Sequence, residues 1–106
     1  LASLPGDQAT QALAKVLLNY QRKHHLWNLR QIVNRWAPTS ENNTGAYVSA
    51  VAKAMAVGPE DSINLEDPDI LASLVAAIIH HENGRNIYAP VIINAAVLDA
   101  QGRSVA

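Results

Sequence analysis

The chain has 106 residues, of which 49% are hydrophobic and 5% aromatic, and its formal net charge at pH 7 is −1. This length suits one domain, and a charge near zero with scattered basic residues argues against partners such as nucleic acid or an anionic membrane surface. Cysteine is absent, which excludes disulfides and thiolate metal sites, and no stretch approaches the roughly 20 apolar residues needed to cross a bilayer. We therefore expect a single helical domain over residues 1–106, and the start at Leu1 without Met suggests a processed or truncated product.

The first predicted helix follows a turn-forming segment at residues 4–7 and ends near Lys23. Apolar residues recur along it at helical intervals: Leu13, Val16, Leu17 and Tyr20. Asp7 or Thr10 is expected to cap its start, because their side-chain oxygens can accept a hydrogen bond from a free backbone N–H.

The second predicted helix is short and ends at about Ala37, because Pro38 disfavours the helical conformation of the residue before it. Its apolar stripe comprises Leu29, Ile32, Val33 and Trp36. Asn28 and Gln31 have the spacing of a capping box, in which each side chain bonds to the backbone N–H of the other residue.

Residues 39–44 are polar and their side chains readily bond to their own backbone, which is typical of a loop. This predicted loop leads into the third helix. Five residues of this helix are expected to point inward: Tyr47, Val48, Val51, Ala52 and Met55. Gly58 is expected to end the helix in the left-handed conformation, and Pro59 reinforces the stop.

The fourth predicted helix has the clearest boundaries and runs from Pro68 to about Asn83. Asp67 provides a carboxylate cap, Pro68 suits the first helical position, and Asp69 lies near the positive end of the helix dipole. Residues 70–79 are apolar around much of the circumference, which is typical of a central helix. A fifth helix is predicted from Pro90 to about Ala100 with Gly102 beyond its end, although residues 91–93 could also begin a strand. These patterns predict an all-α fold, a compact bundle of about five helices around a central apolar helix at residues 68–83.

Glu82 is the residue whose position is least expected for a surface carboxylate. At 100° per residue it lies about 20° around the helix from Leu71 and about 40° from Ile78, so it continues the inward stripe. In the last turn it meets the negative end of the helix dipole, and partial burial would add a second cost to ionisation, so both effects favour the protonated form. A general acid for glycoside cleavage needs that form, because it protonates the leaving oxygen of the sugar bond.

The simpler interpretation is that Glu82 turns into solvent and pairs with Arg85. His81 also lies near the stripe but suits a helix C-terminus as a dipole partner, whereas His80 should face solvent. A metal site through residues 80–82 is disfavoured, because neighbouring helical residues point in different directions and the zinc-hydrolase spacing is absent. The two neighbouring histidines, His24 and His25, are expected at the surface. We therefore expect no metal and no cofactor.

Aromatic residues can line a sugar-binding groove, because their faces stack on pyranose rings. Trp36 and Tyr47 stand on inward stripes and are expected to pack in the core, as is common for aromatic residues. Trp27 is a further candidate, and Tyr88, in the segment after Gly84, is the freer one.

Several spaced motifs, at residues 17–24, 35–38, 41–44 and 79–84, together with Tyr47 and Val51, resemble a family of small phage and prophage proteins described as virion or structural proteins. The resemblance spans residues 9 to 88. Members typically begin with an Asn-rich segment similar to a motif of glucosaminidase-like cell-wall enzymes, and this chain lacks it. Glu82-Asn83-Gly84 is also similar to the Glu-Ser-Gly at which lysozyme-like lytic transglycosylases place their catalytic acid, but that helix comes early in those enzymes and late here.

The resemblance implies a phage virion-associated protein of lysozyme-like character that cleaves peptidoglycan with Glu82 as general acid, in the virion or in the bacterial cytoplasm before assembly. Asn42, Thr44, Tyr88 and His81 are the expected substrate-binding residues. One alternative is a non-catalytic structural module whose partners are other virion subunits. Another is a host-domesticated binding protein. A recess beside Glu82 would favour the enzyme, and an ion pair or subunit contact there would favour the structural module.

Overall fold

A computed structural model describes residues 6–37 and 44–103, with side chains from residue 8 onward. Within these ranges the chain forms five α-helices and no β-strand, as the sequence predicts, and all five contribute to one cluster of buried residues. They are α1 (Gly6–Arg22), α2 (Leu29–Trp36), α3 (Thr44–Met55), α4 (Pro68–Asn83) and α5 (Pro90–Ala100). The residues at 91–93 are therefore helical, and no described helix is long and apolar enough to span a membrane.

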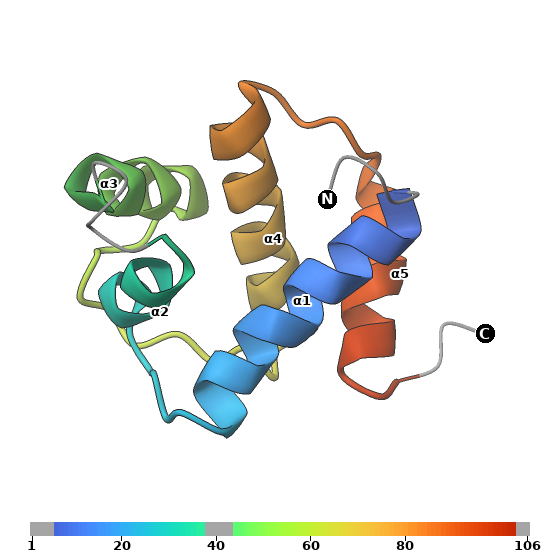
Figure 1. Ribbon diagram of the computed structural model, residues 1–106, viewed down its shortest axis with the longest axis horizontal. Coiled ribbons are helices and arrows are strands. Elements are labelled where there is room, and N and C mark those ends of the chain that lie inside the picture. The colour runs from blue at the N-terminus through green and yellow to red at the C-terminus, as the bar shows by residue number, and fades with distance from the viewer. Residues whose placement is uncertain (1–5, 38–43, 104–106) are drawn as a thin grey trace.

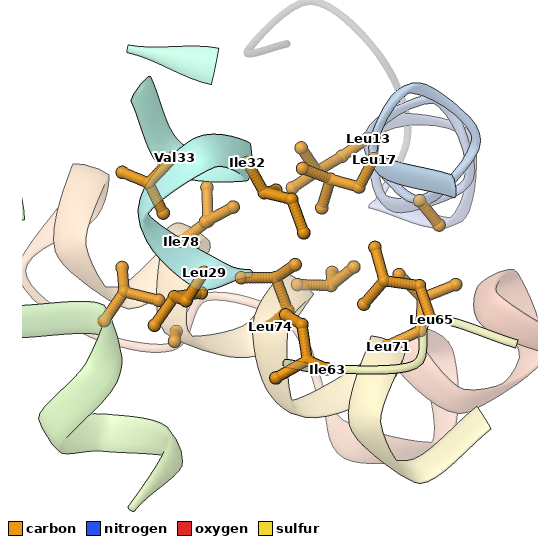
Figure 2. Close-up of a cluster of buried hydrophobic side chains, with 14 of the residues drawn as sticks. Leu13, Leu17, Leu29, Ile32, Val33, Ile63, Leu65, Leu71, Leu74 and Ile78 are labelled. Carbon is orange, nitrogen blue, oxygen red and sulfur yellow. The ribbon is translucent and has the colours of Figure 1, made fainter. Parts of the chain in front are cut away.

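The central position predicted for the fourth helix is confirmed. α4 packs against α1, α3 and α5, and Figure 1 shows it between α3 on one side and α5 on the other, with α1 crossing over. Side chains from α1, α2, α4 and the segment before α4 meet in the core, as Figure 2 shows. Those labelled there are Leu13, Leu17, Leu29, Ile32, Val33, Ile63, Leu65, Leu71, Leu74 and Ile78.

The predicted start signals of α2 and α4 are confirmed. Asn28 Oδ1 accepts from the backbone N–H of Gln31 at 2.9 Å, and Gln31 Oε1 accepts in return from the N–H of Asn28 at 3.4 Å. Asp67 Oδ1 accepts from the N–H of Asp69 at 2.9 Å, with Pro68 in the first turn. Both caps satisfy backbone donors that have no partner inside the helix.

Three local predictions are wrong. α1 begins at Gly6, so Asp7 and Thr10 lie inside the helix and neither is its N-cap. Val16 is 37% exposed, because the packed face of α1 instead includes Leu18. The left-handed residue after α3 is Ala56, at φ 59°, and not Gly58.

Ala56 ends α3 through two backbone hydrogen bonds. Its own N–H donates to Lys53 O, and the next N–H, that of Val57, donates to Ala52 O at 3.0 Å. This pair of bonds defines the Schellman motif, which satisfies the last carbonyls of a helix and requires its left-handed residue at this position. The hydrogen-bonding pattern therefore requires the left-handed conformation at Ala56, although a glycine would adopt that conformation at lower cost.

Two buried glutamines hold the segment that enters α4. Gln21 Nε2 donates to Leu26 O at 3.0 Å and to Ile63 O at 2.9 Å, while its Oε1 accepts from the N–H of Leu65 at 2.6 Å. Gln101 Nε2 donates to Leu65 O at 2.9 Å from the other side. Since a buried backbone polar group without a partner is costly, these side chains substitute for a regular hydrogen-bond ladder.

Candidate functional site

A pocket of about 240 Å³ lies beside the last turn of α4. Glu82 and Asn83 stand at the end of this helix, and Ile78 and Ile79 lie one turn earlier. The remaining lining residues come from α1 and from the segment that follows α4: Ala9, Thr10, Leu13, Ile87 and Tyr88. The pocket is therefore mostly apolar and has one carboxylate among its described lining residues.

The N-terminal half of α1, which packs against α4, forms the wall of the pocket opposite Glu82. Ala9 and Leu13 are each 2% exposed, and they recur at the four-residue spacing that keeps side chains on one helix face. The small side chain of Ala9 limits how far this wall fills the space beside Glu82. The recess thus depends on helices that are far apart in sequence.

Glu82 itself is exposed, so the predicted partial burial of this carboxylate is wrong. The buried residues of α4 end at Ile79, and the residues of its last turn, from His80 onward, are exposed. Among the described side chains, Glu82 forms no ion pair with Arg85. It lies exposed at the rim of a pocket.

Tyr47 is the buried titratable group closest to this turn of α4. It is 5% exposed, and its phenol oxygen accepts a hydrogen bond of 3.1 Å from Nε1–H of Trp36. Its ring lies against the imidazole of His81, with 4.0 Å between the ring centroids. α2, α3 and α4 are therefore joined by one polar contact and one ring contact next to Glu82.

The pKa of Tyr47 is raised to about 12, from an ordinary value near 10. Burial is the largest cause, since a phenolate would lose its hydration. The hydrogen bond from Trp36 acts in the opposite direction, and the Glu82 carboxylate raises the pKa further through its charge and its hydrogen-bonding interaction with the phenol. Tyr47 and Glu82 are thus electrostatically coupled.

The structure separates the predicted substrate-binding residues. Tyr88 is half-buried and lines the pocket with Glu82, whereas His81 is exposed on the α3 side of the same helix end. Thr44 is 3% exposed and its hydroxyl donates to Ala37 O at 2.8 Å, which holds the start of α3, and its role in substrate binding stays a prediction. Asn42 lies outside the described residues.

The described residues contain no group of three or more His, Asp or Glu side chains that could hold a metal ion. His24 and His25 are exposed beyond the end of α1, and His80 is exposed on α4, each as predicted.

Sequence reasoning did not identify the α1 wall of the pocket or the contact of Tyr47 with the end of α4. The helical spacing of Ala9 and Leu13 indicates a buried face but not which helix covers it. Tyr47 carried a partial signal, since a tyrosine on an inward stripe needs a partner for its hydroxyl. The identity of that partner depends on how the helices pair.

In comparisons with known proteins, the chain is similar to Protein P5 of Pseudoalteromonas phage PM2. The two are 33% identical over 78 residues, which cover 74% of this chain and 47% of the phage protein. The chain thus spans about half the length of the curated relative it matches. No protein-family model and no solved structure matches the chain. The similarity relates the chain to a bacteriophage protein.

Proposed function

We propose that this chain is part of a phage virion-associated protein that cleaves the glycan strands of peptidoglycan, with Glu82 as the general acid. One observation carries the proposal: the Glu82 carboxylate lies at the rim of a pocket of about 240 Å³ whose lining includes an aromatic side chain, Tyr88. The similarity to a phage protein supports the virion, or the host cytoplasm before assembly, as its location.

In the proposed reaction Glu82 gives its proton to the oxygen of the glycosidic bond as the bond to the anomeric carbon breaks. The developing positive charge is then met by a nucleophile, and the Glu82 carboxylate accepts the proton that this nucleophile releases. Glu82 is the single carboxylate among the described residues that line the pocket. This favours attack by a hydroxyl of the sugar itself, as in the lytic transglycosylases that the end of α4 resembles, over a mechanism with two enzyme carboxylates.

Tyr88 is proposed to stack on a sugar ring, since its half-buried side chain lines the same pocket. Asn42 and His81 remain proposed substrate-binding residues. His81 would contribute from the opposite side of the helix end, where it packs against Tyr47.

The test is a turbidity or zymogram assay on purified peptidoglycan, with wild type beside Glu82→Gln. The amide keeps the shape of the side chain but carries no transferable acid proton, so activity should fall at least 100-fold while the circular dichroism spectrum is unchanged. Glu60→Gln is the matched control, because Glu60 is also exposed but pairs with Arg30 and does not line the pocket. Absence of cleavage by wild type, or equal activity in Glu82→Gln, would contradict the proposal.

The alternative is a non-catalytic module that docks onto other virion subunits. It is favoured by the exposure of Val91, which is 72% exposed at the start of α5, with Ile87 42% exposed nearby in sequence. Apolar side chains that are exposed together in a patch often mark a contact with another protein. An inactive wild-type chain that binds intact virion subunits, with binding lost in Val91→Asp, would support this alternative.

A further inference from the structure

Tyr88 lines a second recess in addition to the pocket beside Glu82. This recess has a volume of about 330 Å³ and lies between α4 and α5. Its other lining residues come from both helices and from the segment that joins them: Asp69, Ala72, Ser73, Ala76, Asn86, Pro90, Ile93 and Asn94. The two recesses therefore meet at one aromatic side chain.

The recess exists because α4 presents small residues toward α5. Ala72 and Ala76 are four residues apart, and Ser73 lies beside them on the same helix face. Larger side chains at these positions would fill the space between the helices. On the opposite side, α5 contributes the buried Ile93 and the exposed Asn94.

The chemistry of this lining indicates an uncharged, hydroxyl-rich ligand. Two amides, Asn86 and Asn94, and the hydroxyl of Ser73 can each donate and accept hydrogen bonds. Asp69 is the one charged side chain among the lining residues that the structure describes, and these include no cation that would favour a phosphate or a carboxylate. Pro90 and Tyr88 provide apolar surfaces against which the faces of a sugar ring can pack.

The recess on the other side of α4 provides a contrast within the same molecule. It lies between α3 and α4, and its lining contains Lys53, His80 and His81 but no carboxylate. Lys53 therefore provides a cation for an anionic group on that side of the helix, whereas the described lining of the recess between α4 and α5 provides none.

We infer that the recess between α4 and α5 is a second sugar subsite, which binds a neighbouring unit of the same N-acetylated glycan whose other unit occupies the pocket beside Glu82. Tyr88 is the shared platform between the two units. The choice of glycan rests on the proposed function, but the location of the subsite rests on the lining of the recess. A ligand that spans both recesses binds more tightly than one that fills a single recess, because its second contact is made by a molecule that is already bound.

The experiment measures binding of a soluble tetramer of β-1,4-linked N-acetylglucosamine to the Glu82→Gln chain, which avoids cleavage during the measurement. Backbone amide shifts in NMR spectra should change at Ser73, Asn86 and Asn94 as well as at residues beside position 82. Asn94→Ala should weaken binding about tenfold, the effect expected for loss of one hydrogen bond to a ligand. Asn94 is exposed on a helix, where alanine is well tolerated, so the variant is expected to fold.

Asn34→Ala is the matched control, because Asn34 is an exposed helical asparagine that lines neither recess. Equal binding by Asn94→Ala and Asn34→Ala, shift changes confined to the pocket beside residue 82, or no binding at all would overturn the inference. Tyr88→Phe should keep most of the affinity and Tyr88→Ala should lose it, since the ring supplies the platform.

Failure of this inference can be distinguished from failure of the proposed function. A chain that binds the tetramer through Asn94 but leaves peptidoglycan intact has the subsite without the reaction. A chain that cleaves peptidoglycan at the same rate with and without Asn94→Ala, and binds the tetramer equally well, has the reaction without the subsite.

Discussion

The indole N–H of Trp36 donates a hydrogen bond of 3.1 Å to the phenol oxygen of Tyr47, which leaves the phenol proton free to be donated elsewhere. A phenol can accept one hydrogen bond and donate another at the same time. The Glu82 carboxylate lies near enough to raise the pKa of Tyr47, so the buried α2–α3 contact is coupled to the rim of the pocket.

The first prediction concerns that coupling. Glu82→Gln removes the negative charge that disfavours a phenolate, so the pKa of Tyr47 should fall from about 12 but stay above its ordinary value, because burial is the larger cause. Tyrosinate absorbance measured against pH reports this ionisation, and Tyr47→Phe identifies its contribution among the three tyrosines. The same titration in Glu60→Gln should match wild type. An unchanged Tyr47 titration in Glu82→Gln would show that the two groups do not interact.

A second prediction concerns stability at alkaline pH. The folded pKa of Tyr47, about 12, is above the unfolded value near 10, so its protonated form stabilises the fold fully below pH 10. This contribution is lost as pH rises from about 10 through 12, because the unfolded chain releases the phenol proton first. Urea unfolding at pH 8, 10 and 12 should show a smaller decrease in Tyr47→Phe than in wild type. At pH 8 that variant should be about 1 kcal/mol less stable, since the Trp36 donor loses its acceptor.

Gln21 provides a third prediction, because its side chain satisfies three backbone groups around the segment that enters α4. Gln21→Leu keeps a similar volume but leaves two carbonyls and one N–H without a partner. The free energy of unfolding should fall by about 3 kcal/mol or more, at roughly 1 kcal/mol or more for each group. Gln8→Leu, at an exposed position of the same helix, should change it by less than about 0.5 kcal/mol. Similar stability of the two variants in chemical denaturation would contradict the role of Gln21.

A fourth prediction concerns the end of α3. Ala56 has φ 59°, a conformation that costs residues with a Cβ roughly 1–2 kcal/mol and costs glycine little. Ala56→Gly should therefore raise the free energy of unfolding by about 0.5–1 kcal/mol, after the greater freedom of glycine in the unfolded chain is subtracted. Ala54→Gly, two residues earlier inside the helix, should lower it by about 1 kcal/mol. Thermal unfolding of the two variants should therefore shift in opposite directions.

The starts of α2 and α4 could be predicted from sequence because the signals that fix them are local. The capping pair of Asn28 and Gln31 and the Asp67-Pro68 start of α4 act within a single turn, and both are present as predicted. The apolar stripes likewise give the direction of each helix face, which is why the core residues of α2 and α3 were identified. The all-α fold and the central place of α4 follow from these patterns.

What the stripes could not give is how far each packed face extends, since that depends on which neighbour covers it. Glu82 continues the stripe of α4 and Val16 that of α1, yet both are exposed in the described part of the chain. The α1 wall of the pocket, the contact of Tyr47 with the end of α4 and the recess behind Tyr88 all arise between helices distant in sequence. Periodicity fixes the angle of a side chain around its own axis, whereas only the packing of the helices decides whether that direction leads to core, pocket or water.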